Sequence, residues 1–347
     1  MDDIARLHAN DRSELFSTAS AKRGDMLPAL IEKDFWVCWT LQRIFTLEAP
    51  PAGLVFKGGT SLSKVFQAID RFSEDVDLSF DRNVFGFGGE NDPAKAPSKK
   101  QTAKRLEKLS ATCQEMVRTR FLPQLEVSFG KALGTAPSGK TWRIELDLDD
   151  PDKQTLLFHY PAGIAHGESA PARYLRPSVR LELGARGEQW PAELAVIMSY
   201  AAQAIPTPFK NPSCRVKVLA GERTFWEKAT ILHALYHLPP EKRLPTRHSR
   251  HYYDLMKLYG KEVGKKAIAD LGLLQSVVKH KSIFFASAAA RYDLAVPGTL
   301  KLVPPQNRRR ELEEDYAKMR EMIFVQPPEW DNLIQELTRL EEKINRI

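Results

Sequence analysis

The stretch from Leu54 to Asp81, LVFKGGTSLSKVFQAIDRFSEDVDLSFD, constrains the fold of this 347-residue chain more than any other. It opens with a short apolar run, which predicts a buried strand, and the Gly58-Gly59 pair that follows permits a sharp turn and close backbone approach. Apolar residues at 62, 65, 66 and 69 then recur at helical spacing, which places Ser61 at or beside a helix N-cap. A strand, a glycine turn and a helix start bring free N–H groups and the positive end of the helix dipole together, as phosphate binding requires.

The second half of the stretch supplies two carboxylates. In Asp75-Val76-Asp77-Leu78-Ser79-Phe80, apolar and polar residues alternate, which predicts a strand with both aspartates on one face, about 7 Å apart. Hard oxygen ligands at this spacing suit Mg²⁺. Each half alone is compatible with a plain turn or a solvated strand face, but a phosphate cradle beside a metal-binding pair favours phosphoryl or nucleotidyl transfer.

Both halves, KGGTSLSK and RFSEDVDL, resemble the nucleotidyltransferase signature of the DNA polymerase beta superfamily. More narrowly, they are similar to the AbiEii/AbiGii abortive-infection toxins, whose relatives include the MenT toxins. The resemblance implies an α/β fold: a polymerase-beta-like nucleotidyltransferase core with a mixed or antiparallel sheet, followed by an α-helical C-terminal lobe. We expect the core and its N-terminal helices to span 1–205 and the mainly helical domain to span 206–347.

The resemblance and the residue chemistry together give the expected roles within this stretch. Asp75 and Asp77 are expected to hold Mg²⁺ or Mn²⁺ with the triphosphate of an NTP. The residues expected to bind phosphate oxygens or to line the same mouth are Lys57, Gly58, Gly59, Thr60, Ser61, Arg71 and Ser73.

A third catalytic carboxylate has two possible sources. Glu145, Asp147 and Asp149 share one face of a predicted strand, 142–149, which would equally be a solvated acidic strand. Glu182 shares a face with Arg180 on another, 179–183. The R-x-E-x-x-x-R pattern of the second resembles a strand of the family and favours Glu182, whereas chemistry alone does not choose.

Two further residues lie downstream. Lys228 falls among apolar residues in a predicted helix, where an amine is costly unless it faces a cleft; there it would neutralise charge as pyrophosphate leaves, although a snorkelling surface lysine is the alternative. It matches a family lysine of the E-K-x-x-x-L-H type. Asp254 matches the aspartate of the family's R-D-x-Y-D-L segment, with His251 standing where an acid is frequent. Both are expected to be catalytic.

The remaining pattern predicts further elements around these motifs. Predicted helices cover 2–23, 28–47, 102–122, 261–290, 312–322 and 330–347, with Trp36 and Trp39 of the second as core residues. Further strands are predicted at 125–129, 155–160 and 215–219. Antiparallel pairing is expected because the connection 150–154 is too short for a helical crossover.

Composition limits the setting. The three cysteines, Cys38, Cys113 and Cys214, are too few and too widely spaced for a disulfide framework or a zinc site. No run approaches the roughly 18 apolar residues of a membrane span, so we expect no membrane association and a cytoplasmic, reducing location. The net charge of +7 favours a polyanionic partner.

The expected function follows from the resemblance. It implies a Mg²⁺-dependent nucleotidyltransferase that transfers NMP from an NTP to tRNA or another RNA. Such a protein would be the toxin of a toxin–antitoxin system in phage defence, with its antitoxin encoded next door. The alternatives are a nucleotidyltransferase acting on a small molecule or a protein, and a non-catalytic nucleotide-binding interaction protein.

Overall fold

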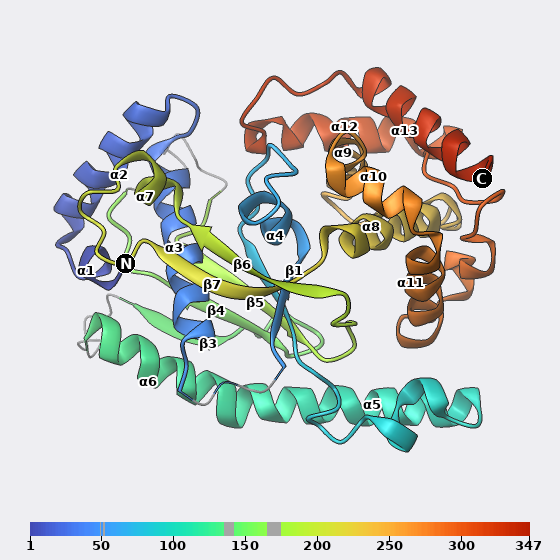
Figure 1. Ribbon diagram of the computed structural model, residues 1–347, viewed down its shortest axis with the longest axis horizontal. Helices are drawn as coiled ribbons and strands as arrows, with labels where there is room; N and C mark the ends of the chain where they lie inside the picture. Colours follow the sequence, from blue (N-terminus) through green and yellow to red (C-terminus); the bar gives the residue numbers. More distant parts are fainter. Residues whose placement is uncertain (49, 51–52, 135–141, 165–174) are drawn as a thin grey trace. The chain divides into compact units, whose positions relative to one another are not determined.

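The structure is a computed structural model that describes residues 1–48, 50, 53–134, 142–164 and 175–347. The chain forms two compact units (Figure 1). The first unit contains Met1–Val65, Phe72–Asp92 and Ala96–Val218, and the second contains Phe66–Arg71, Pro93–Lys95 and Leu219–Ile347. The domain boundary predicted between residues 205 and 206 stays a prediction.

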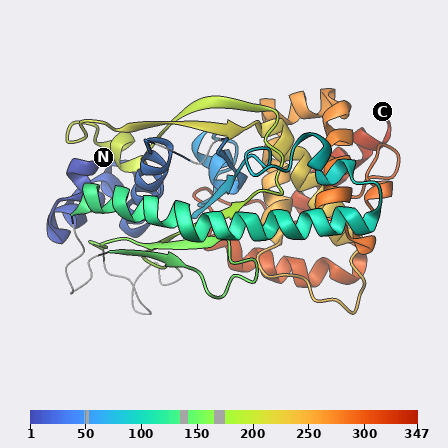
Figure 2. The same ribbon diagram turned by 90° about the horizontal axis from the view of Figure 1, so that it is seen from below.

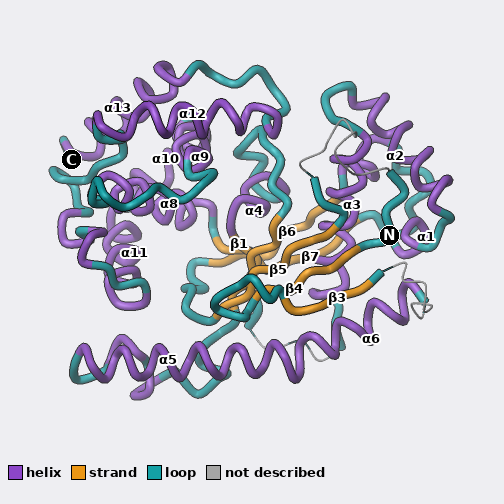
Figure 3. The backbone as a smooth tube through the Cα atoms, turned by 180° about the vertical axis from the view of Figure 1, so that it is seen from behind, coloured by secondary structure: helices purple, strands orange, loops and turns teal. Residues whose placement is uncertain are grey.

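A mixed sheet is the centre of the first unit. Within the described residues its seven strands lie in the order β3-β4-β5-β2-β1-β7-β6, coloured orange in Figure 3. Their bounds are β1 Val55–Lys57, β2 Asp75–Ser79, β3 Arg143–Leu146, β4 Thr155–His159, β5 Ser178–Gly184, β6 Ala192–Met198 and β7 Ser213–Leu219. Strands β3, β4 and β5 pair antiparallel, as do β1 and β2, whereas β2 with β5 and β1 with β7 are parallel. The predicted α/β class with a mixed sheet is confirmed; β6 was not predicted.

Helix α3, Pro28–Phe45, covers the sheet with aromatic side chains. Its proline sits in the first turn, where no hydrogen bond is lost. Trp36 stacks on Tyr160 with ring centroids 5.4 Å apart, and Trp39 packs on Phe158 at 5.5 Å. Both tryptophans are fully buried, which confirms their prediction as core residues. The other helices of this unit are α1 Asp2–Ala5, α2 Ala9–Arg23, α4 Gly58–Lys64, α5 Lys99–Met116, α6 Leu122–Leu133 and α7 Tyr200–Ala204.

The predicted strand 125–129 is wrong, because these residues lie in α6. A π-helical turn, Val117–Phe121, joins α5 to α6, and Figure 2 shows the resulting long helical run in teal and green. Leu125, Val127 and Phe129 look like strand alternation, but Val127 is 58% exposed while Leu125 and Phe129 are buried. Phe121 and Ala132 are buried too, so the true period is that of a helix.

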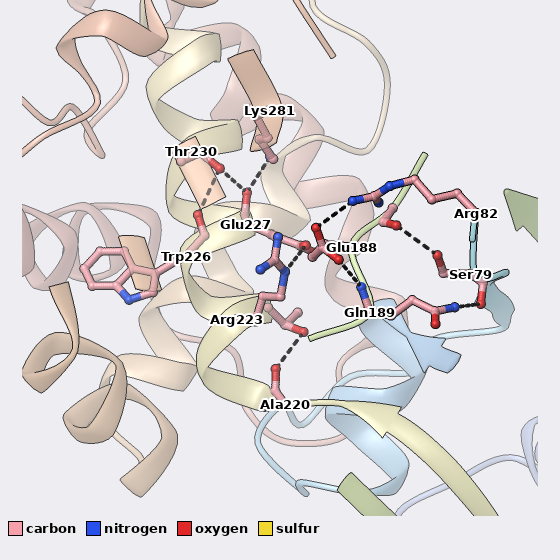
Figure 4. Close-up of polar contacts among 12 residues, drawn as sticks. Ser79, Arg82, Glu188, Gln189, Ala220, Arg223, Trp226, Glu227, Thr230 and Lys281 are labelled. Atoms are coloured by element: carbon pink, nitrogen blue, oxygen red, sulfur yellow. Dashed lines mark hydrogen bonds and ion pairs between the residues drawn. The ribbon is translucent and has the colours of Figure 1, made fainter. Parts of the chain in front are cut away.

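The second unit is helical in its described residues. Its helices are α8 Gly221–Tyr236, α9 Ser249–Tyr259, α10 Glu262–Ala269, α11 Leu271–Phe284, α12 Arg309–Met319 and α13 Trp330–Asn345. Helix α8 is fixed by two side-chain bonds to its neighbours. Lys281 of α11 donates to the backbone oxygen of Glu227 at 2.9 Å (Figure 4), and the Trp226 ring N–H donates to the Ala267 oxygen of α10 at 3.1 Å.

In the part of the chain that the structure describes, no helix has both the length and the apolar character needed to cross a membrane.

Two neighbouring residues of α3 hold both halves of the glycine and aspartate motif. Asp34 pairs with Lys64, the last residue of α4, at 2.7 Å, and its other oxygen accepts from the backbone N–H of Tyr200. Lys33 pairs with Glu74, just before β2, at 2.9 Å. The Asp34, Lys64 and Lys33 side chains are nearly completely buried, so α3 fixes α4 and the start of β2 from one place.

Removing one partner of the Asp34–Lys64 pair should destabilise the protein strongly, because it leaves a buried charge without compensation. We expect Asp34→Ala to lower the free energy of unfolding by about 3–5 kcal/mol. The double variant Asp34→Leu/Lys64→Met removes both charges and should cost less than the single change. Urea denaturation measures this, with Arg118→Ala, at an exposed ion pair, as a control expected to stay within about 0.5 kcal/mol of wild type. A double variant as unstable as the single would contradict this account.

Candidate active site

Strand β2 presents its aspartates between two neighbouring strands of the first unit. Asp77 is in register with Glu182 of β5 and with Lys57 of β1, so these three residues occupy adjacent positions in one row across the sheet. Neighbouring strands lie about 5 Å apart. In the next row, Asp75 is in register with Arg180. The sheet therefore places two predicted carboxylates, Asp77 and Glu182, side by side.

Arg180 offsets part of the negative charge in this area. Its guanidinium donates to Glu182 at 3.1 Å and to Asp147 at 2.6 Å. Partial burial alone would lower the pKa of Arg180, but Glu182, Asp147 and Asp75 raise that pKa above its ordinary value. Three carboxylates from three strands thus share one cation, which reduces their mutual repulsion.

Gly58 lets helix α4 begin directly against Asp77. The helix starts at Gly58 with Lys57 as its N-cap, and Gly58 has a φ of +80°, in the region that favours glycine. A Cβ atom on Gly58 would overlap the Asp77 carboxylate. Glycine is therefore required on two counts, and the two halves of the motif meet at this position.

Thr60 and Ser61 differ from their expected places. We expected Ser61 at or beside the N-cap, but it lies in the fourth position of α4 and its hydroxyl donates to the Gly58 oxygen at 2.8 Å. Thr60 donates to the Asp75 backbone oxygen and lies 3.0 Å from the Ser73 hydroxyl. Both side chains are buried, and Thr60 joins the start of α4 to the start of β2.

The expected continuation of this helix to Ile69 is also wrong. Helix α4 ends at Lys64, and Gln67 has a left-handed φ of +47°. Phe66 and Ile69 keep helical spacing because they are packed, but they pack within the second unit. Apolar spacing indicates burial here without indicating a helix.

Arg71, Lys228 and Asp254 come together in the second unit. The carboxylate of Asp254 on α9 accepts from two nitrogens of Arg71, at 2.6 and 2.7 Å, and from Lys228 of α8 at 2.8 Å. All three side chains are buried. Lys228 is therefore a buried, ion-paired lysine, not a snorkelling surface lysine.

The charges of these groups are set by burial and by one another. Burial would raise the pKa of Asp254, but Arg71 and Lys228 hold it well below its ordinary value, so this carboxylate is ionised at neutral pH. Burial lowers the pKa of Lys228, although Asp254 opposes this effect.

Segment 66–71 is tied to the second unit at several points besides Asp254. Asp70 pairs with Lys257 of α9 at 2.5 Å, and its backbone oxygen accepts from Phe324 at 2.9 Å. Arg71 also forms a β-bridge with Ile323. We expected Arg71 at the phosphate-binding mouth; the structure places its side chain on Asp254.

The other candidate carboxylates lie elsewhere in the sheet. Glu145 on β3 is three strands from Asp75 in the same cross-strand row, ~14 Å away. It pairs with Arg143 and His159, each at 3.0 Å. Asp147 is buried and paired with Arg180, and Asp149 follows the end of β3. Only Glu182, among these candidates, is directly beside Asp77.

The donors that the first unit offers to a divalent metal are Asp75 and Asp77. Among the described residues, no group of three or more His, Cys, Asp or Glu side chains is arranged to hold a metal ion. Mg²⁺ commonly takes only one or two carboxylates and completes its shell with water and substrate phosphate oxygens. Two aspartates on one strand face therefore fit a metal that arrives with a nucleotide.

A comparison with protein families gives a match over residues 39–336 to the model described as nucleotidyl transferase AbiEii toxin of a type IV toxin–antitoxin system. No curated protein matches the chain. Among solved structures, it is similar to MenT4, a nucleotidyltransferase toxin from Mycobacterium tuberculosis, with 15% sequence identity, coverage of 88% of this chain and 98% of that chain, and a TM-score of 0.40.

The family match spans most of the chain and includes the glycine pair, the Asp75–Asp77 strand, Lys228 and Asp254. It confirms the predicted family and the enzyme class, nucleotidyltransferase. The chain belongs to the AbiEii family of nucleotidyl transferase toxins of type IV toxin–antitoxin systems.

Proposed function

We propose that the protein transfers NMP from an NTP to tRNA, or to another RNA, with Mg²⁺ or Mn²⁺, and that this modification stops translation as part of phage defence. The observation that carries the proposal is the position of Asp77, which lies against the start of α4 at Gly58 and in register with Glu182. This arrangement puts acidic groups for a metal and a proton beside a helix start suited to phosphate.

The reaction needs one bond to form and one to break. An acceptor hydroxyl, such as an RNA 3′ end, attacks the α-phosphorus; the bond from that phosphorus to the bridging oxygen breaks, and pyrophosphate leaves. Asp77 or Glu182 takes the hydroxyl proton. A metal held by Asp75 and Asp77 would supply positive charge to the phosphate oxygens.

The phosphate contacts are assigned to three groups of residues. Backbone N–H groups of Gly58, Gly59 and Thr60 form the first turn of α4, and Lys57 stands beside Asp77. Ser61 and Ser73 support this turn through Gly58 and Thr60. In the second unit Lys228 neutralises charge on the departing pyrophosphate, while Arg71 and Asp254 hold it in place.

The charge of the chain favours RNA as the acceptor. The net charge is +7, and exposed lysines at positions 99, 100, 104 and 108 line one side of α5. Contacts between such cations and phosphates release counterions and make binding sensitive to salt. A small-molecule or protein nucleotidyltransferase would show no salt-sensitive RNA binding, and a non-catalytic nucleotide-binding protein would bind NTP without transferring label.

The toxin role implies a partner. A type IV toxin–antitoxin system includes an antitoxin, which we expect a neighbouring open reading frame to encode. NTPs and tRNA are cytoplasmic, so we expect the protein to act in that compartment.

One assay tests the proposal directly. Incubation of the protein with each α-³²P-labelled NTP, Mg²⁺ and total RNA should label tRNA, and EDTA should abolish labelling. Asp75→Ala should reduce transfer by about 10³-fold or more, because the metal and triphosphate lose a ligand, and should remove toxicity while thermal unfolding stays near wild type. A toxic, active Asp75→Ala protein would refute the metal-binding role, and label on protein or small molecules alone would refute the RNA acceptor.

Substitution of the two candidate carboxylates separates their roles. We expect Glu182→Gln to reduce transfer by about 10²-fold, since the residue beside Asp77 could no longer take a proton. Glu145→Gln, three strands from Asp75, should leave transfer within about twofold of wild type. Single-turnover rates measured across pH would check both; an inactive Glu145→Gln with an active Glu182→Gln would reverse the assignment.

Lys228→Met should weaken the use of NTP without unfolding the protein. The variant keeps the apolar stem, and Asp254 still accepts both bonds from Arg71. We expect the KM for NTP to rise about 10-fold or more, because a charge-assisted contact to phosphate is lost. Lys281→Met on α11 is the control, since that lysine bonds the adjacent Glu227 backbone. Equal KM values for Lys228→Met and wild type would restrict Lys228 to a structural role.

A further inference from the structure

Arg250 is the second residue of α9, one helical turn before Asp254. Residues four apart lie on the same face of a helix, so Arg250 and Asp254 share a face. The Arg250 side chain is partly exposed, and the described residues form no ion pair or hydrogen bond with it. An arginine without a protein partner at this position is available to a ligand.

Arg250 lies close to the buried lysine of α8. Its charge lowers the pKa of Lys228, after the larger effects of burial and Arg71 and against the pull of Asp254. It also lowers the pKa of His251 and His248, in addition to burial. These effects indicate that Arg250, Lys228 and His251 form one cluster within the second unit.

Positive charge exceeds negative charge in this cluster. Arg71, Lys228 and Arg250 surround one carboxylate, that of Asp254. The nearby acids are otherwise engaged. Asp70 pairs with Lys257, and Asp315 accepts from the backbone of residues 247 and 249 and from the Ser249 hydroxyl. Uncompensated buried cations are costly, and an anionic ligand would offset that cost.

His251 supplies a second indication of a ligand. Its Nδ1 atom is enclosed and has no hydrogen-bond partner among the described residues. Burial and the charges of Lys228 and Arg250 lower the pKa of His251 well below its ordinary value, so the ring is neutral. Enclosed polar atoms in proteins are normally hydrogen-bonded, and a phosphate oxygen would accept a hydrogen bond from Nδ1–H.

We propose that Arg250, together with Lys228 and His251, binds the β- and γ-phosphates of the nucleotide. The guanidinium group of Arg250 matches phosphate bidentately, which a lysine does not. This inference rests on the proposed function, since it names residues for the triphosphate of the same reaction. It adds Arg250 and His251 to the expected site residues.

Binding measurements on the full chain test the inference. Calorimetry would compare wild type, Arg250→Ala and Arg250→Lys with NTP, inorganic pyrophosphate and NMP as ligands. We expect Arg250→Ala to weaken NTP and pyrophosphate binding by about 10- to 100-fold, and NMP binding by less than twofold. Arg250→Lys should recover part of the loss. Arg243→Ala, at an exposed arginine of the same unit, is the matched control and should bind all three as wild type does.

The outcomes separate this inference from the proposed function. Arg250→Ala that binds NTP as wild type does, while wild type transfers label, overturns the phosphate role and leaves the proposed function standing. Equal losses for NMP and NTP, or loss of RNA binding alone, also overturn it. Wild-type protein that binds NTP but labels no acceptor contradicts the proposed function and leaves the phosphate site standing. Thermal unfolding of each variant should match wild type, because Arg250 has no described protein partner to lose.

Discussion

The buried ion pairs of helix α3 are the constraint on which the first unit depends. Asp34 holds the end of α4 through Lys64, and Lys33 holds the approach to β2 through Glu74. Taking these charges out of water is costly, so the pairs contribute little net stability compared with apolar residues of the same size. They specify position instead: a lysine or carboxylate buried here is tolerated only when its partner is within bonding distance. Helix α4 and strand β2 are thereby held to one scaffold, and Thr60 then joins their near ends.

The two units contribute opposite charges to the proposed chemistry. The first unit gathers carboxylates on adjacent strands and moderates them with a single arginine, Arg180. The second gathers cations around a single carboxylate, Asp254. Each cluster is unbalanced by itself, the first towards a metal cation and the second towards a phosphate anion. A nucleoside triphosphate with its metal carries both kinds of charge, which is why this substrate class suits both units.

Local patterns in the sequence predicted β2, the aromatic face of α3 and the strands β4, β5 and β7, because each has a clear period or a clear start signal. They did not predict where α4 ends, since Phe66 and Ile69 are buried for a reason that lies in distant helices. They also misassigned 125–129, where three apolar residues at alternate positions hid a helix whose Val127 faces solvent. Spacing indicated Asp75, Asp77 and Glu182, but the register that aligns Asp77 with Glu182 depends on pairing between segments about a hundred residues apart. The bonds of Arg71 to Asp254 depend on contacts of the same long range, and no local pattern reveals them.

Segment Phe66–Arg71 has a consequence for dissecting this protein. It belongs to the second unit, although the chain on both sides of it belongs to the first. Cutting the gene after Val218 would therefore not yield a self-sufficient half. The N-terminal fragment would carry Arg71 without the carboxylate of Asp254, and the C-terminal fragment would lack the guanidinium that neutralises it. The two halves are interleaved by a six-residue thread, so the enzyme is modular in shape but indivisible as a polypeptide.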